Sequence, residues 1–460
     1  MLKKDFEGFL NIRDKRLKIK GYKRVKEDYL YIFKNIVNGE VVKHQEKRKE
    51  EVLYIYGTIS YIPNSCPNCK CENYKDILVK DGFDTVKIQW LDISDRKTYL
   101  IVDKQKIKCN NCNKGFTVLF NDCKKHCRKA KVVYNKIDNE LIVSKNSLTD
   151  IARITNVSTE TVEKVLQTHV KHIKVNKKRL PRVLGIDEVN GVETYKGKYN
   201  CLLLDIENYK VQDFLPTRRK DYLETYFNSY DNEVKDKVEF LVTDMYDIYI
   251  NLAKDHFKNA KIVIDRFHIV NLVIRLFDGL RNELRKQYKK DTLEYNLLYK
   301  FRELFKVKYK NLSTKYKKFN GRYRLFHSDY EVVQYALSLS KNLEEAYYLL
   351  QNIYDMLDNK DISIFYNILA NTDISNLRIK SVVETLVKYK EYIKNAIIYE
   401  YSNAKVESAN GIVKRIKRNA YGFRNFENLR IRVFLVFNYV ERHRRITKIR
   451  LTNKEKLKAG

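Results

Sequence analysis

The sequence predicts a multidomain α/β protein in which a mixed-sheet core follows a cysteine-rich β unit and a helical pair. Its 460 residues exceed one ordinary domain, and 44% of them are hydrophobic, enough for sizeable cores. Two Cys-x-x-Cys pairs lie near the N-terminal end. Beyond residue 182, strand-like runs first follow one another and then alternate with helices, which is the order of a mixed sheet.

The charge balance favours a polyanionic partner. The chain carries 91 Lys and Arg against 58 Asp and Glu, a formal net charge of +33. A codon bias towards Lys would add bases but would not explain the deficit of acids. Nucleic acid is therefore the expected partner.

Nothing in the sequence predicts a membrane partner. No apolar run approaches the roughly 20 residues that span a bilayer, and the N-terminal MLKKDFEGFLNIRDKRLKIK lacks the apolar stretch of a signal peptide. A cytoplasmic location is expected. In that reducing compartment, paired cysteines favour a metal site over disulfides.

Residues 1–60 form a basic and aromatic N-terminal segment. Its pattern predicts a helix from Arg24 to Asn38. The role of the segment stays open between a DNA-contacting arm and a packed lead-in.

Residues 61–127 predict a zinc ribbon. Each Cys-x-x-Cys knuckle turns two thiolates towards one point, which suits one structural, tetrahedral Zn²⁺. The gap between the knuckles is long, and alternating apolar residues explain it as a hairpin. The expected ligands are Cys66, Cys69, Cys109 and Cys112. The alternative ligands, which are otherwise spare thiols, are Cys71, Cys123, His126 and Cys127.

Residues 138–174 predict a helix-turn-helix DNA-binding domain. DIARI reads as the first helix, Asn156 and Val157 as the turn, and Ser158 as the N-cap of a second helix placed for the major groove. An ordinary helical hairpin would share this pattern. The residues expected to contact DNA are Ser158, Thr159, Glu160, Thr161 and Lys164. A basic linker, VNKKRLPR, then marks a domain boundary.

Residues 182–270 predict the first part of the sheet core. The strand-like runs are VLGIDEV, GKYNCLLLDIEN, VQDFLP, VEFLVTD and KIVIDRFH, with helices from about Lys220 to Tyr230 and up to about Asn259. Asp187 interrupts the first run, and Asp244 ends the fourth. The fourth strand is expected beside the first, so that Asp244 lies near Asp187, with Asp265 one strand further out.

The rest of the chain reads as helical. Residues 271–400 predict a helical insertion, 401–440 a helix that returns to close the core, and 441–460 a basic tail. Glu407, Asn410, Lys414 and Arg418 fall on one helical face. A lone acid among bases is common on a solvated helix face. Two upstream aspartates at strand ends, however, favour the interpretation that Glu407 joins them in one metal site. Two Mg²⁺ ions need shared carboxylates to act on a phosphodiester, and Asp187, Asp244 and Glu407 would supply them.

In their order over about residues 65 to 435, these segments resemble the DDE-type insertion-sequence transposases of the branch called the ISL-three family. The resemblance lies in CPNC…CNNC, DIARITNVSTETV, VLGIDEV, VTDMYDIY, VIDRFHIV and VESANGIVKRIKRNAYGFRNFENLR. It implies a ribonuclease H-like mixed-sheet catalytic core with an all-helical insertion, and Asp187, Asp244 and Glu407 as its triad. The long lysine-rich segment before the ribbon departs from the family pattern.

The resemblance implies a transposase that binds terminal inverted repeats and catalyses DNA strand cleavage and strand transfer with two Mg²⁺ ions, for which Mn²⁺ can substitute. Double-stranded DNA of the element ends and of the target would be its partner, bound by a homodimer because two ends must be paired. From spacing alone, Asp265 could replace Asp244 as the second metal ligand, but the strand order favours Asp244 and gives Asp265 and His268 a supporting role. The alternatives for His268 are a contact with the scissile phosphate and a packed, hydrogen-bonded histidine. The phosphate-holding residues would be Lys414, Arg415, Lys417 and Arg418. The alternatives are a non-catalytic zinc-ribbon/helix-turn-helix regulator and a nuclease that cuts without joining.

Overall fold

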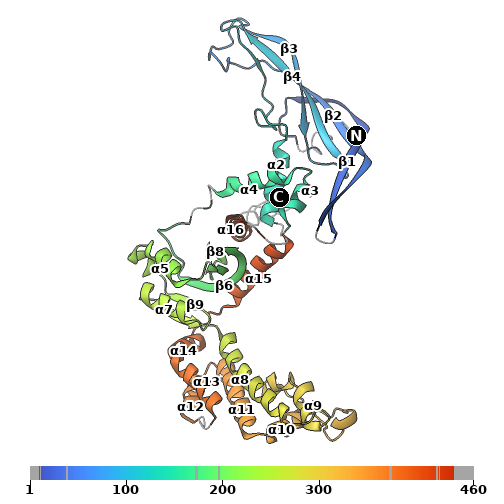
Figure 1. The fold of residues 1–460 in the computed structure, drawn as a ribbon. Coiled ribbons are helices and arrows are strands. Elements are labelled where there is room, and N and C mark those ends of the chain that lie inside the picture. Colours follow the sequence, from blue (N-terminus) through green and yellow to red (C-terminus); the bar gives the residue numbers. More distant parts are fainter. Residues whose placement is uncertain are drawn as a thin grey trace, which may run out of the picture. The chain divides into compact units, whose positions relative to one another are not determined.

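The chain forms two compact units, each with its own core (Figure 1). Unit 1 comprises residues 1–174, 418–422 and 439–460, and unit 2 comprises 175–417 and 423–438. The computed structural model describes residues 10, 12–37, 40–143, 146–170, 173, 175–194, 197–371, 376–420, 423 and 425–439.

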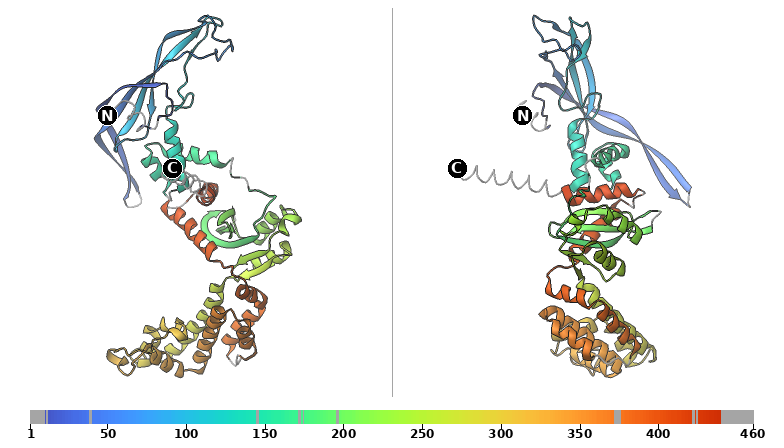
Figure 2. Two further views of the ribbon diagram at one scale, coloured as in Figure 1. Left: turned by 180° about the vertical axis from the view of Figure 1, so that it is seen from behind. Right: turned by 90° about the vertical axis from the view of Figure 1, so that its left-hand side faces the viewer.

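Unit 1 begins with a sheet in the order β1-β2-β4-β3, in which β5 pairs with β4. Its strands are β1 (Leu17–Val37), β2 (Glu40–Ile59), β3 (Leu78–Gln89), β4 (Lys97–Cys109) and β5 (Gly115–Thr117). β2 pairs with β4 only from Val52 onwards, so β1 and β2 continue beyond the sheet as a two-stranded ribbon (Figure 2).

The helix expected from Arg24 to Asn38 is wrong, because β1 runs through this segment to Val37. Its residues pair antiparallel with β2 along its length, up to Val37 opposite Glu40. The run is rich in aromatic and β-branched residues, and Asn38-Gly39 separates it from the next such run. That dipeptide between two strand-like runs is a strong hairpin signal. Pairing with β2 therefore decides the structure over the weaker helical spacing.

Unit 1 also holds three helices, α2 (Lys131–Val143), α3 (Leu148–Ile154) and α4 (Thr159–Val170). The hydroxyl of Ser147 accepts a hydrogen bond from the Asp150 backbone N–H at 3.0 Å and so caps α3. Asn156 has a φ of 51°, which turns the chain between α3 and α4. Ile151, Val162 and Leu166 are fully buried where the helices pack. The expected pair of helices around this turn is present.

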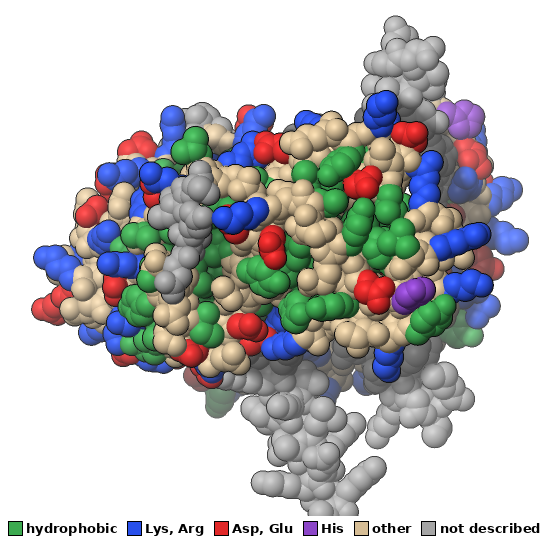
Figure 3. Space-filling view, turned by 90° about the horizontal axis from the view of Figure 1, so that it is seen from below, with side chains coloured by type: hydrophobic (Ala, Val, Ile, Leu, Met, Phe, Trp, Pro, Cys, Tyr) green, Lys and Arg blue, Asp and Glu red, His purple; other side chains and the backbone are tan. Residues whose placement is uncertain are grey.

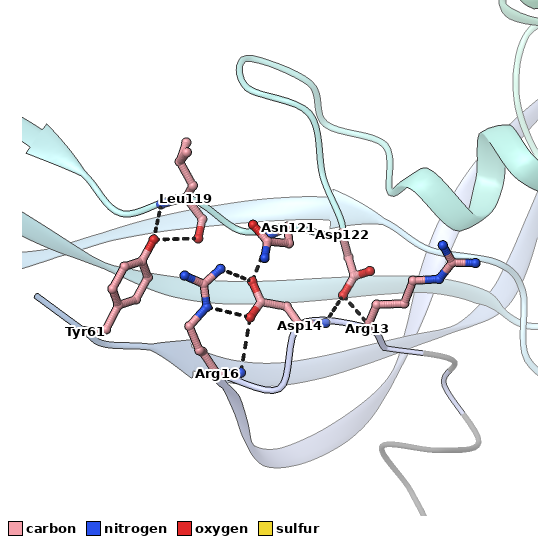
Figure 4. Close-up of polar contacts among 7 residues, drawn as sticks. All are labelled: Arg13, Asp14, Arg16, Tyr61, Leu119, Asn121 and Asp122. Carbon is pink, nitrogen blue, oxygen red and sulfur yellow. Dashed lines mark hydrogen bonds and ion pairs between the residues drawn. The ribbon is translucent and has the colours of Figure 1, made fainter. Parts of the chain in front are cut away.

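Two buried carboxylates tie residues 13–16 to the segment after β5 (Figure 4). Asp122 accepts hydrogen bonds from the backbone N–H groups of Arg13 and Asp14 at 2.9 and 2.8 Å. Asp14 in turn accepts one from the Asn121 N–H at 2.8 Å and two from the Arg16 guanidinium. Burial alone would raise the pKa of Asp14, but the bonds from Arg16 and Asn121 outweigh it and lower that pKa.

Unit 2 contains the mixed sheet, in the order β10-β9-β6-β7-β8. Its strands are β6 (Val183–Thr194), β7 (Gly197–Asp205), β8 (Lys210–Leu215), β9 (Phe240–Thr243) and β10 (Lys261–Ile264). β6, β7 and β8 pair antiparallel, whereas β9 is parallel to both β6 and β10. The prediction that the fourth strand of the core lies beside the first is confirmed.

Helices accompany this sheet, and α15 approaches it most closely. They are α5 (Lys220–Asn228), α6 (Asn232–Lys235), α7 (Asp247–His256), α15 (Ala404–Asn419), α16 (Phe426–Phe434) and a final π-helical turn at Leu435–Tyr439. A Cβ atom placed on Gly185 of β6 would lie 2.5 Å from the Val406 side chain of α15. Only glycine therefore permits this contact between helix and strand.

A helical region lies between β10 and α15. Its helices are α8 (Arg266–Lys286), α9 (Leu293–Lys300), α10 (Asp329–Ser338), α11 (Lys341–Asn359), α12 (Ile362–Asn371), α13 (Leu377–Lys388) and α14 (Lys390–Ile398). Short 3₁₀ turns occur at Leu304–Lys306, Tyr309–Asn311 and Gly321–Tyr323. Figure 3 shows charged side chains of both signs among apolar ones on its surface. Among the described residues, no helix is long and apolar enough to cross a bilayer.

Candidate active site and cysteine cluster

Four cysteines of unit 1 converge on one point. Their sulfur atoms lie within 4.8 Å of one another, with Cys66 and Cys112 3.8 Å apart and Cys69 and Cys109 also 3.8 Å apart. None of the eight cysteines forms a disulfide. Four convergent thiols of this kind suit tetrahedral zinc, in agreement with the ligand set expected from the knuckles.

The alternative ligands differ in where they lie. The Cys71 thiol is 3.2 Å from that of Cys69, so it borders the cluster as a fifth sulfur. The Cys123 thiol instead donates a hydrogen bond to the carbonyl of Cys127 at 3.0 Å. Among the described residues, Cys123, Cys127 and His126 do not form a convergent ligand group. The alternative ligands Cys123, His126 and Cys127 therefore do not form a second site among the described residues.

The carboxylates of unit 2 form a row at one edge of the sheet. Gly185 pairs with Val242, and Thr243 with Ile264, in parallel register. Continuing that register by one or two residues places Asp187 opposite Asp244 and Asp244 opposite Asp265. Asp244 and Asp265 directly follow the ends of β9 and β10, and Asp187 stands opposite Asp244 within β6, so three carboxylates from three neighbouring strands meet there.

α15 adds a fourth carboxylate beside Asp265. Ligand atoms of Asp265, His268 and Glu407 lie within 4.8 Å of one another. Within the described chain, Asp187 and Asp244 are not part of a group of three with the same spacing. The structure therefore brings Glu407 closest to Asp265 and His268, while Asp187 and Asp244 adjoin this group along the row.

Two asparagines of the returning segment hold Asp187. The side-chain amide of Asn410 on α15 donates to Asp187 Oδ2 at 2.8 Å, and that of Asn403 donates to the same oxygen at 3.4 Å. Asp187 Oδ1 accepts the Glu188 backbone N–H at 2.7 Å. Both asparagines are buried, so the carboxylate is oriented by groups that cannot turn freely.

The row is short of positive charge, and its pKa values reflect this. Burial, and then the neighbouring Asp244 charge, raise the pKa of Asp187 to about 7. Burial and then Glu188 raise the pKa of Asp244 to about 6. Burial also raises the pKa of Asp265. Adjacent carboxylates that resist ionisation together are typical of sites that hold cations or move protons.

Four acceptor oxygens at this site are buried and have no hydrogen-bond partner among the described residues. They are Asp244 Oδ1, Asp265 Oδ2, Asn403 Oδ1 and Asn410 Oδ1. A buried acceptor that lacks a donor is costly, and divalent cations take such oxygen ligands. The residues present therefore fit a divalent metal, and the donor set of carboxylate and amide oxygens suits Mg²⁺.

Sequence reasoning missed a charged pair beside the row. Glu188 forms an ion pair with Arg218, which lies between β8 and α5. The Arg218 guanidinium lies 4.6 Å from the ring centre of Tyr199 and 5.1 Å from that of Tyr246, and it lowers the pKa of Asp244 against the larger effects of burial and Glu188. Glu188 could have been identified from the sequence, because it stands next to Asp187 in the chain. No local pattern marks Arg218.

The residues expected to contact DNA are accessible. Ser158, Glu160 and Lys164 of the α4 region are exposed, and Thr159 and Thr161 are half-buried. On α15, Lys414, Arg415 and Arg418 are exposed, whereas Lys417 hydrogen-bonds the side-chain oxygen of Asn190 at 3.2 Å.

Comparison with known families decides the assignment. A family model of the ISL3 group of DDE transposases, described as "Transposase", matches residues 184–433, more than half of the chain. The chain belongs to the ISL3 family of DDE transposases. A second model, described as "zinc-finger of transposase IS204/IS1001/IS1096/IS1165", matches residues 62–112, which include all four clustered cysteines. The proteins of this family are transposases, which act on DNA with the help of divalent metal ions.

A shorter stretch of the chain is similar to a protein whose name describes another activity. A Lactococcus lactis subsp. lactis protein named "ATP-dependent protease" is 32% identical to this transposase over 105 residues, 23% of this chain and 34% of that protein. The chain thus covers about a third of the length of that relative. Its name describes that protein alone.

Proposed function

We propose that the transposase cleaves DNA at the terminal inverted repeats of its element and joins the freed 3′-hydroxyl ends to target DNA. The catalytic unit would be a ribonuclease H-like core in which Asp187, Asp244 and Glu407 are the triad. The in-register row of carboxylates, with acceptors that lack donors, carries this proposal. Two Mg²⁺ ions, or Mn²⁺ in their place, would activate the attacking oxygen and stabilise charge on the leaving oxygen.

The chain's own residues orient this site. Asn403 and Asn410 both donate to Oδ2 of Asp187 and so fix the orientation of this carboxylate. Asp187 would be the ligand shared between the two ions. Asp244 and Glu407 would each hold one ion. Asp265 accepts the Phe267 backbone N–H at 3.3 Å as the N-cap of α8, so its role would be to support the Glu407 side together with His268.

DNA would be held outside this acidic row. Phosphates near the scissile bond would contact the cations of α15 that lie two or more turns after Glu407. They are Lys414, Arg415, Lys417 and Arg418. α4 would read the element ends through Ser158, Thr159, Glu160, Thr161 and Lys164. One structural zinc per chain would hold the ribbon, and a homodimer would pair two ends.

A non-catalytic regulator is less well supported. Such a protein has no need to gather carboxylates that raise one another's pKa, since burying them without cations lowers stability. A nuclease without joining activity would share the same site, and only its products would differ.

The test is a strand-transfer assay. The purified transposase would be incubated with Mg²⁺ and labelled duplexes carrying the ends of its own element, together with target plasmid. We expect a nicked strand and then labelled end joined to plasmid. Nicks without joined product would identify a nuclease, and bound but uncut DNA would identify a regulator. Asp187→Asn protein, which retains the shape of the side chain, is the matched control.

A further inference from the structure

Unit 1 contains a basic groove that the catalytic proposal leaves unused. Its volume is about 950 Å³, and it lies between β3 and the segment that follows β5. Its cations are Lys87, Lys104, Lys124, Lys125, Arg128 and Lys129. Asp84 is the acidic residue among the side chains that line it. The groove is therefore strongly positive.

The groove cations are not neutralised within the described chain. None of the six forms an ion pair with a described carboxylate; Lys87 donates instead to the Tyr54 hydroxyl at 2.8 Å and lies 4.0 Å from the ring centre of Tyr99. Lys87, Lys124, Lys125 and Arg128 are exposed. Uncompensated cations gathered along a concave surface concentrate anions there.

The loop 124–129, the basic loop, is held in place from both of its ends. Cys123 and Ala130 form an antiparallel bridge across it, and the Cys123 thiol donates to the Cys127 carbonyl. The end of β3 also holds it, because the Gln89 N–H donates to the Arg128 carbonyl at 2.8 Å and the Ala130 N–H donates to the Gln89 carbonyl at 2.9 Å. The cations are thus presented on a preorganised loop.

The carboxylate tie of Figure 4 fixes the segment that leads into the basic loop. Asp122 immediately precedes Cys123 and accepts two backbone N–H bonds from Arg13 and Asp14. Asp14 in turn accepts a hydrogen bond from the Asn121 N–H. This wall of the groove therefore depends on a contact with the N-terminal segment, which gives that segment a structural role.

We propose that the basic groove binds the phosphate backbone of duplex DNA. Cations stand on two walls, Lys87 and Lys104 on the sheet and the others on the basic loop, so a strand passing between them would contact both. Lysine and arginine contacts of this kind position a duplex without reading its sequence. The inference rests on the proposed function only in taking DNA as the polyanion.

The experiment measures binding of the full-length, zinc-loaded protein to a fluorescent duplex of random sequence at several salt concentrations. The groove variant is K124Q/K125Q/R128Q/K129Q. The control variant, K289Q/K315Q/K318Q/R322Q, removes the same charge from exposed positions of the helical region in unit 2. Each lost phosphate contact lowers the slope of log binding constant against log salt by about 0.9. We expect the slope to fall by about 3 to 4 in the groove variant and by less than about 1 in the control.

A second variant separates geometry from charge. Asp122→Ala makes the protein more positive by one charge, yet it should weaken binding, because it removes the acceptor of both backbone N–H bonds and so loosens the basic loop. Zinc content and melting temperature identify any variant that fails to fold. If the Asp122 variant fails to fold, the result of the folded groove variant decides the test. Unchanged binding by the groove variant, an equal loss in the control, or stronger competition by duplex RNA than by DNA would each overturn the assignment. Absence of DNA binding by the wild type would instead overturn the proposed function.

Discussion

Asp187→Asn should stabilise unit 2 of the metal-free protein at alkaline pH while it abolishes catalysis. The pKa of Asp187 is raised to about 7, first by burial and then by Asp244, so its ionised form is disfavoured in the folded state. A carboxyl with a raised folded pKa stabilises the protein below its unfolded pKa and loses that contribution as pH rises through the folded value. The loss should therefore occur between about pH 4 and 7.

The magnitude follows from that shift. Raising a pKa from 3.8 to about 7 corresponds to at most about 4 kcal/mol at about 1.4 kcal/mol per pKa unit. Asp187 is half-buried, so water screens part of this cost, and we expect a gain of about 2 kcal/mol at pH 8. Asparagine keeps the acceptor for the Glu188 N–H. Its new amide group replaces Oδ2, so the bonds from the Asn403 and Asn410 amides are lost, and the expected gain is smaller than the full electrostatic cost.

Hydrogen exchange followed by mass spectrometry would measure this gain, because it reads unit 2 separately. Amides of β6 and β9 give the opening free energy of the sheet. The single tryptophan, Trp90, lies in unit 1, so its fluorescence serves as an internal reference that should not change. The buffer should be free of divalent ions but contain no chelator, so that zinc is retained.

Asp213→Asn is the matched control. Asp213 is also buried, but its carboxylate pairs with Arg430 at 2.9 Å and accepts the Tyr226 hydroxyl. Removing that charge leaves Arg430 without its partner and should destabilise unit 2. A loss of stability in Asp187→Asn at pH 8, or the same gain at pH 4 as at pH 8, would refute the electrostatic account of the row.

Other predictions address the remaining parts of the site. Cys109→Ser should release zinc, measured by metal analysis, while joining of pre-nicked ends by unit 2 persists. Wild-type protein without zinc would contradict the cluster. Asp244→Asn should abolish cleavage and joining while binding of the element ends stays intact, whereas Asp265→Asn should only reduce activity. An inactive Asp265→Asn protein together with an active Asp244→Asn protein would mean that the triad is misassigned. Gly185→Ala should cost roughly 2 kcal/mol and displace α15, with activity falling at least tenfold; wild-type activity and melting temperature would contradict the close packing against Val406.

The sheet and most of its acidic edge could be predicted because both depend on local pattern. Short apolar runs that end in Asp244 and Asp265 mark strand ends directly, and parallel pairing carries them to one edge. The N-terminal strands could have been predicted as well, since Asn38-Gly39 was available in the sequence. The apolar residues of this segment also fit a helical spacing, but pairing with the neighbouring strand decides its structure.

The position of Glu407 could not be predicted so finely, because it depends on how the helical region returns to the sheet. Asn395 of α14 donates to the Ile262 carbonyl of β10 at 2.9 Å, and Arg266 donates to the Ala396 carbonyl at 2.7 Å. These contacts bring the chain back beside β10, the outer parallel strand. Glu407, near the start of α15, therefore arrives next to Asp265, and Asn410, one turn later, reaches Asp187.

This geometry bears on what Asp265 does. A residue that only caps α8 would not need a second oxygen buried without a donor, yet Asp265 Oδ2 is such an atom and lies in one group with Glu407 and His268. Its burial is costly unless a cation or a proton satisfies it. The support proposed for Asp265 is thus electrostatic as well as structural, and this is why Asp265→Asn should lower activity while the fold is retained.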